Sequence, residues 1–281
     1  MKKLLTAIIA VLATHSALAG VKIEHWLSPT GARVYFVESR VLPILDVQVD
    51  FAAGSMFDPP GKSGTAALTR SVLGLGAGKL DETAIAEQMA DIGATLGGGA
   101  DTDRASVAVR TLAAAEKRDA ALGVLRTVLQ APRFEAAIFE REKARTVAGL
   151  KEALTRPDSI AGKAFWAAMY PDHPYGRTAT PESVAALTRD DLVAHHSRYY
   201  TAANGSITLV GDISRAEAER FAEAIAAGLP KGAPATLPPA PQVVPGKAVR
   251  LKHPACRAHS NIVMPAIERG NPDFFPKIAG N

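Results

Sequence analysis

The feature that most constrains the fold is an alternation of side chains between residues 45 and 51. Leu45, Val47, Val49 and Phe51 are apolar, and polar residues stand between them. Successive side chains of a β-strand point to opposite faces, so this pattern predicts a strand with one face in a core and one in water. Such strands are typical of antiparallel sheets, because strands of parallel sheets are usually buried on both faces.

Other segments alternate between strand and helix patterns. Strands are predicted at 21–27, 32–38, 95–99, 105–111 and 206–210, and helices near 63–73, 81–92, 114–130, 135–154 and 158–170. Three further helices are predicted to begin at the capping residues Thr180, Thr188 and Ser214. We therefore expect an α+β fold, in which a mostly antiparallel sheet is covered on one face by helices.

The N-terminus has the pattern of an export signal. Lys2 and Lys3 precede an apolar run over residues 4–12, and Ala17-Leu18-Ala19 is a cleavage site of small residues. We expect a signal peptide over residues 1–19, cleavage after Ala19 and a periplasmic or secreted protein with no transmembrane segment left after cleavage; the alternative is a retained N-terminal anchor. Cys256 is the only cysteine, so an internal disulfide is impossible and a packed core must stabilise the chain.

Charge gives no sign of nucleic-acid binding. Removal of Lys2 and Lys3 would lower the formal net charge from +4 to +2. No excess of basic residues remains to hold a phosphate backbone, so we expect no nucleic-acid partner.

The composition changes near residue 229. Residues 229–246 contain six prolines and are interpreted as a semi-extended linker that follows an α+β domain at 20–228. Strands are then predicted at 247–252 and 259–264, with a helix from Asp273. This order repeats the beginning of the mature chain, so residues 247–281 are interpreted as the start of a second, truncated α+β domain.

Several short motifs occur in a characteristic order. They are Phe51-Ala-Ala-Gly-Ser55 before a Pro-Pro-Gly turn, His173-Pro-Tyr-Gly176, His196-x-x-Tyr199 with Asn204, Leu209-Val-Gly-Asp212, and the segment from Glu268 to Asp273. In this order and spacing, over about residues 21–281, the chain resembles the N-terminal half of the pitrilysin/insulinase family of zinc metallopeptidases.

The resemblance implies a zinc site whose residues are missing here. In active members the helix after the Pro-Pro-Gly turn carries His-x-x-Glu-His, with two histidines as zinc ligands and the glutamate as general base. Alignment on Gly64 places Ala67 and Ser71 at the histidines and Arg70 at the glutamate. Alanine has no donor atom, arginine cannot act as a base, and serine is a poor zinc ligand.

The family's third ligand is a glutamate seven residues after another glutamate. Glu142 matches the earlier one, and Gly149 falls at the ligand. No shift of alignment restores the motif, because residues 52–172 contain no histidine. We expect no catalytic residue, no metal and no cofactor; a plain Ala/Leu-rich core helix at 63–75 is the alternative and leads to the same expectation.

Two other groups of residues are candidates for function. In active members the strand near residue 98 accepts a substrate peptide as an additional strand, which implies a peptide-binding edge at Gly98, Gly99, Ala100, Asp101 and Thr102. A bulged edge strand without a ligand is the equal alternative. His195 and His196 are adjacent and would point in different directions on a helix, so we expect core or surface histidines rather than a metal pair.

Three functions can be weighed against these observations. The first is an exported, non-catalytic subunit that completes the chamber of a zinc peptidase pair and offers peptide-binding surface to a partner bearing His-x-x-Glu-His. The second is a stand-alone periplasmic peptide-binding or scaffold protein. The third, an active zinc peptidase, conflicts with the side chains at the ligand positions.

Overall fold

The computed structural model describes residues 21–242, 248–254, 260–262, 270–274 and 276. Its centre is a six-stranded sheet with the strand order β1-β2-β8-β3-β7-β6. The strands are β1 (Glu24–Leu27), β2 (Arg33–Glu38), β3 (Ile44–Phe51), β6 (Thr95–Gly97), β7 (Ala105–Leu112) and β8 (Gly205–Gly211). Only β2 and β8 pair in parallel, and the other four pairings are antiparallel.

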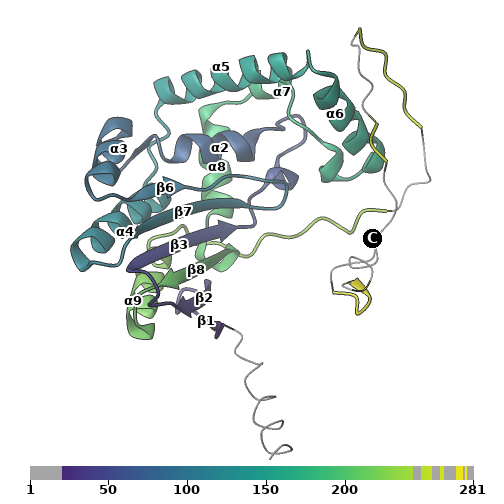
Figure 1. Cartoon of the computed structure of the whole chain (residues 1–281). Coiled ribbons are helices and arrows are strands. Elements are labelled where there is room, and N and C mark those ends of the chain that lie inside the picture. Colours follow the sequence, from purple (N-terminus) through teal and green to yellow (C-terminus); the bar gives the residue numbers. More distant parts are fainter. Residues whose placement is uncertain (1–20, 243–247, 255–259, 263–269, 275, 277–281) are drawn as a thin grey trace, which may run out of the picture.

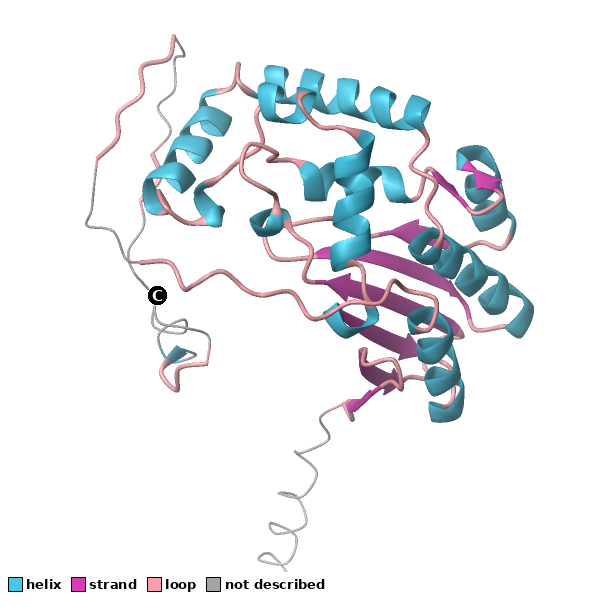
Figure 2. Cartoon of the chain, turned by 180° about the vertical axis from the view of Figure 1, so that it is seen from behind, coloured by secondary structure: helices cyan, strands magenta, loops and turns pink. Residues whose placement is uncertain are grey.

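Helices cover one face of the sheet, and the other face is open (Figures 1 and 2). They are α2 (Thr65–Leu73), α3 (Glu82–Asp91), α4 (Ala115–Gln130), α5 (Ala136–Ala153), α6 (Pro157–Met169), α7 (Pro181–Ala185), α8 (Arg189–Tyr199) and α9 (Arg215–Ala226). Three short 3₁₀ turns, η2 (Ser55–Phe57), η3 (Pro174–Gly176) and η4 (Ala202–Asn204), and a small hairpin of β4 (Gly76–Ala77) and β5 (Leu80–Asp81) complete the domain.

The central strand confirms the expected half-buried pattern. Leu45, Val47, Val49 and Phe51 are at most 1% exposed, whereas Gln48 on the other face is exposed. The apolar side chains of β3 pack under the helical layer together with those of β7 and β8. Burial of this single face supplies the main free energy that holds the helices to the sheet.

Capping residues fix the helix starts as expected. The side chains of Thr180, Thr188 and Ser214 accept hydrogen bonds from the third residue of α7, α8 and α9, and each forms a reciprocal capping box. Asp81 caps α3 by accepting from the N–H of Ala84. These bonds satisfy backbone groups that would otherwise be unpaired at the helix ends.

The C-terminal region differs in part from expectation. Residues 248–252, expected to be a strand, have no regular secondary structure, because they find no neighbouring strand among the described residues. Residues 255–259 and 263–269 lie outside the described residues, and so does the signal peptide expected at 1–19. Half of the strand expected at 259–264 is also outside them, and its described residues 260–262 have no regular secondary structure. The domain boundaries proposed from composition stay predictions.

Candidate functional site: helix α2 and the neighbouring edge strand

The N-terminus of α2 is held by a buried carboxylate. Asp58, only 4% exposed, accepts hydrogen bonds from the N–H groups of Gly64 (2.7 Å) and Ala66 (2.8 Å). Burial raises the pKa of Asp58 to about 6, and the two N–H groups act against that rise. Gly64 has φ of 108°, and a Cβ there would lie 2.7 Å from Val184 Cγ2, so glycine is needed at this start.

The three positions of the expected motif lie on the side of α2 that faces away from the core. Ala67 and Ser71 are exposed, and Arg70 is half-buried. The opposite side of the helix buries Leu68 and Val72. The Ser71 hydroxyl donates to the carbonyl oxygen of Leu68 (2.9 Å), so its hydrogen is already used within the helix.

The fourth position lies on α5, which packs against α2. Gly149 is exposed and offers no side chain. Glu142 is buried, and its carboxylate accepts from Arg141 Nε (2.9 Å) and lies 3.8 Å from Arg145 Nη1. The fold therefore brings the two helices of the expected site together, but the remaining glutamate is paired with arginine.

These residues do not fit a zinc ion. Ala67 and Gly149 have no donor atom, and the cationic side chain of Arg70 would repel a dication. Within the described residues, no group of three or more His, Cys, Asp or Glu side chains could hold a metal ion. No step of metal chemistry can be assigned to this arrangement.

Arg70 instead binds the edge of the sheet. Its Nε donates to the carbonyl oxygen of Ser106 on β7, and its Nη2 donates to the carbonyl oxygen of Gly97 on β6. Partial burial removes water from the guanidinium and lowers the pKa of Arg70, although an arginine stays charged in proteins. The sequence identified Arg70 only as a lost base, whereas the structure shows it as a link between α2 and the sheet.

The reason for this link is a kink at Gly98. Gly97 lies opposite Ala108, and Ala100 lies opposite Ala105, so the register is the same on both sides and no residue is inserted. The bulge, which was the equal alternative to a peptide-binding edge, is therefore not found: Gly98 adopts a φ of 115° and no residue is added.

The kink leaves one carbonyl without its usual partner from the neighbouring strand. Ser106 N–H donates to the carbonyl oxygen of Gly99 (2.7 Å), but Gly99 N–H turns to the Ser106 side-chain oxygen (3.1 Å). The Ser106 carbonyl accepts from Arg70 instead. The run of three glycines was the sequence signal for a distortion, but nothing in the sequence linked it to Arg70.

The candidate peptide-binding edge is exposed along its length. Residues 97–104 are all exposed, and β6 is the last strand of the sheet. The carbonyl oxygens of Asp101 and Thr102, however, accept from the N–H groups of Ser55 (3.0 Å) and Met56 (2.9 Å). A peptide that adds as a strand would find these two carbonyls occupied, and Gly99 already uses its N–H and its carbonyl on Ser106, so the accessible part of the candidate edge narrows to Gly98 and Ala100.

The two adjacent histidines of α8 are core residues. His195 and His196 are 4% and 5% exposed, and their Nε2 atoms lie 3.1 Å and 3.0 Å from the carbonyl oxygens of Ala53 and Leu129. Burial lowers the pKa of each histidine to about 4. Both rings are therefore neutral at pH 7 and bind different parts of the backbone, as expected of core histidines.

The fold, with its packed helices α2 and α5, is shared with known proteins. The model of Insulinase (Peptidase family M16) matches residues 33–181, and that of the Peptidase M16 inactive domain matches residues 186–276. The chain belongs to the insulinase family. Its relatives include an uncharacterised zinc protease of Rickettsia bellii, which is 22% identical over 191 residues, covering 66% of this chain and 45% of the relative.

Solved structures agree with this family. The peptidase M16 inactive domain from Pseudomonas fluorescens has a TM-score of 0.76 and 36% identity, covering 79% of this chain and 54% of its own. Pitrilysin shares the fold with a TM-score of 0.65 and 17% identity, covering 76% of this chain and 23% of its own. This insulinase-family chain thus spans about half the length of the first relatives it matches.

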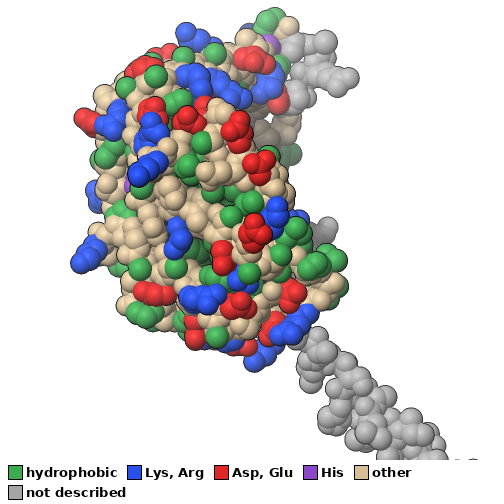
Figure 3. All heavy atoms as spheres, turned by 90° about the vertical axis from the view of Figure 1, so that its left-hand side faces the viewer, with side chains coloured by type: hydrophobic (Ala, Val, Ile, Leu, Met, Phe, Trp, Pro, Cys, Tyr) green, Lys and Arg blue, Asp and Glu red, His purple; other side chains and the backbone are tan. Residues whose placement is uncertain are grey.

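The described surface carries no single-sign patch on the side that bears α3 and α4. Acidic and basic side chains are interspersed there (Figure 3).

No helix among the described residues has both the length and the apolar character to cross a bilayer.

Proposed function

We propose that this protein is an exported, non-catalytic subunit of a zinc peptidase pair. In this proposal it completes the chamber and contributes peptide-binding surface, while a partner chain bearing His-x-x-Glu-His holds the metal. One observation carries the proposal: all four positions of the metal site lack its chemistry, although α2 and α5 are still packed together as a site would require.

The way α2 is retained supports a role in binding or assembly. The helix start is fixed by Asp58, its inner side is buried, and Arg70 ties it to the kinked edge of the sheet. Ala67, Ser71 and Gly149 contribute only small groups to the outer side. A surface of this kind allows a polypeptide to approach closely, as strand addition at the neighbouring glycine-rich edge would require.

Export rests on the N-terminal residues alone. The cleavage site at Ala17-Leu18-Ala19 supports removal of the leader after Ala19 and release into the periplasm or the medium. N-terminal sequencing of the mature protein from cell fractions tests this part of the proposal. A chain that keeps Met1 would contradict it.

The stand-alone peptide-binding protein is the second candidate, because the exposed edge needs no partner to bind a peptide. An active zinc peptidase is disfavoured by the residues at the four ligand positions.

Co-expression separates these functions. The chain is expressed together with the His-x-x-Glu-His protein encoded nearest to it, and the pair is tested for co-purification and for hydrolysis of a fluorogenic peptide. We expect a stable complex that hydrolyses the peptide faster than the partner alone. A free chain that still binds the peptide would favour the second candidate, and a chain that binds neither would overturn the proposal.

A matched pair of variants tests the peptide-binding edge. A Cβ at Gly99 or at Gly123 meets nothing within 4 Å, so Gly99→Asp and Gly123→Asp should both fold. Gly99 lies beside the kinked edge, whereas Gly123 lies on α4. We expect Gly99→Asp to weaken peptide hydrolysis by the pair about 10-fold and Gly123→Asp to leave it unchanged; equal effects would contradict a role of this edge.

A further inference from the structure

The proline-rich linker is bound to the domain at two places. The first is Asn204, a residue 4% exposed, whose Oδ1 accepts from the N–H of Ala235 (2.9 Å). The Nδ2 group of Asn204 donates to the carbonyl oxygens of Tyr199 (2.7 Å) and Ala52 (3.0 Å). The amide is thus held rigidly by the core, and it fixes the path of the linker after α9.

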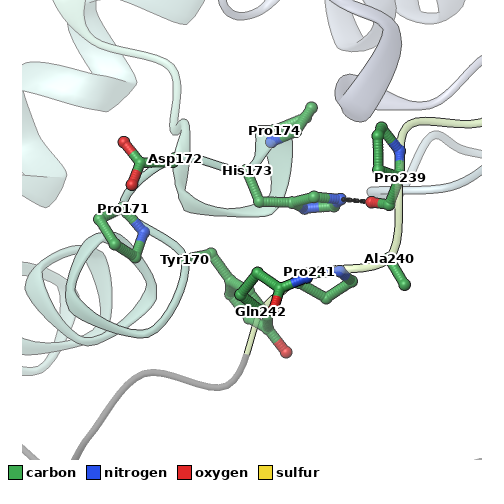
Figure 4. A pocket seen from close by; sticks show the side chains of 9 residues that line it. All are labelled: Tyr170, Pro171, Asp172, His173, Pro174, Pro239, Ala240, Pro241 and Gln242. Atoms are coloured by element: carbon green, nitrogen blue, oxygen red, sulfur yellow. Dashed lines mark hydrogen bonds between the residues drawn. The ribbon is translucent and has the colours of Figure 1, made fainter.

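The second place is the segment after α6, where the linker and the domain enclose a cavity of about 290 Å³. Residues 170–174 line one side, and residues 239–242 line the other. Figure 4 shows the rings of Tyr170 and His173 on the domain side, and Pro239 and Pro241 on the linker side. His173 Nε2 lies 3.1 Å from the carbonyl oxygen of Pro239.

The hydrogen bonding of His173 defines its tautomer. Its Nδ1 accepts from the N–H of Tyr175 (3.2 Å), so in the neutral ring the proton is on Nε2. That N–H can donate to a carbonyl, and the carbonyl of a proline is free to accept because no helix or sheet uses it. His173 therefore presents a directed donor beside an apolar ring.

Aromatic side chains surround this donor. Tyr170 stacks on Trp166 with ring centroids 5.7 Å apart, and it meets Tyr175 edge to face at 5.5 Å. Tyr175 in turn donates to the carboxylate of Asp103 (2.7 Å), which ties this cluster to the edge loop. Trp166 is still 45% exposed, and no residue of α6 is fully buried although the helix is largely apolar.

We propose that Tyr170 and His173 form a recognition site for proline-rich segments, and that residues 238–241 of this chain occupy it. Extended proline-rich segments are bound by aromatic rings, together with a side chain that donates a hydrogen bond to a prolyl carbonyl. Prolines 238, 239 and 241 restrict the backbone before binding, so docking costs little conformational entropy. The linker is then a docked strap that leaves the domain beside α6, not a free spacer.

The anchor at Asn204 strengthens this docking. Pro239 is only four positions after Ala235, so the anchored chain reaches at most about 14 Å. A short tether of this kind gives the linker an effective concentration in the millimolar range at the site. A free peptide of the same sequence must compete with that concentration.

The competition provides the test. In one variant of the full chain, residues 238–241 are replaced by Gly-Ser-Gly-Ser, and a fluorescein-labelled peptide with the sequence of residues 235–242 is titrated in an anisotropy assay. We expect the replaced chain to bind the peptide at least about 10-fold more tightly than the wild type, whose own linker fills the site. A peptide with its prolines changed to alanine should not bind.

Further variants show where the peptide binds. In the replaced chain, Tyr170→Ala and His173→Ala should each weaken binding at least 5-fold, and His173→Ala serves alone if circular dichroism shows that Tyr170→Ala has not folded. Tyr35→Ala, at an exposed tyrosine on β2, is the matched control and should leave binding unchanged. Equal binding by wild type and replaced chain, no binding by the replaced chain, or no effect of either variant would overturn the proposal.

Discussion

Replacing Arg70 by alanine should destabilise the protein by about 3 kcal/mol. The variant loses two hydrogen bonds from a charged donor, to the carbonyl oxygens of Ser106 and Gly97. Bonds of this kind contribute about 1.5–3 kcal/mol each, and the lower value applies because water can reach the edge strand once the side chain is gone. Lysine has a single ammonium group in place of the guanidinium with its two donating nitrogens, so we expect Arg70→Lys to lose about half as much free energy of unfolding as Arg70→Ala.

Urea denaturation measures this loss, and Arg104→Ala is the matched control. Arg104 lies in the same edge region but is 61% exposed in its side chain and reaches Asp101 only at 3.7 Å, so its loss should change stability by at most about 0.5 kcal/mol. Hydrogen exchange of the Ser106 amide, which bonds across the kink to Gly99, should be faster in Arg70→Ala than in the control. Equal free energies of unfolding for the two alanine variants would refute the argument that Arg70 replaces the missing bond of the sheet.

Three further predictions concern pH, the kink and the linker anchor. Lowering the pH from 7 to 5 should reduce the free energy of unfolding by about 2–3 kcal/mol, measured by urea denaturation. The two buried histidines of α8 have pKa values of about 4, so the unfolded chain binds protons on them at higher pH than the folded chain does, whereas protonation of folded Asp58, with its pKa raised to about 6, opposes the loss by about 1 kcal/mol. A free energy of unfolding that does not change between pH 7 and pH 5 would contradict this prediction. Gly98→Ala should lower stability by about 2–3 kcal/mol, because φ there is 115° and its Cβ would meet backbone, whereas Gly99→Ala has open space and should be neutral in the same assay. Asn204→Ala should cost about 3 kcal/mol and speed tryptic cleavage at Lys231, because three backbone groups lose their partner; unchanged cleavage would show that the linker is held elsewhere.

Local patterns in the sequence predicted the fold well because they record local physical chemistry. Alternation on β3 reflects the two faces of a strand, and the capping boxes at Thr188 and Ser214 reflect unpaired groups at helix ends. The absence of zinc ligands could also be read directly, since it depends only on which residue types occupy four positions. Packing of α2 against α5 followed from the resemblance rather than from any pattern.

Contacts between distant residues could not be predicted in this way. The bond from Arg70 to Ser106 on β7 joins residues 36 apart, and that from Tyr175 to Asp103 joins residues 72 apart. Gly97-Gly98-Gly99 indicated a distortion, but whether it adds a residue depends on the register beyond it. The strand expected at 247–252 is not formed by its described residues 248–252 for a related reason, because a strand pattern needs a neighbouring strand to pair with.

The zinc content of the purified full chain tests the central claim most directly. Elemental analysis after equilibration with excess zinc and gel filtration should find well below 0.1 zinc per chain, because Ala67, Arg70, Ser71 and Gly149 offer no ligand set. A ratio near one zinc per chain, lost when one side chain within the described residues is replaced, would contradict the account, because it would show that these residues do form a metal site.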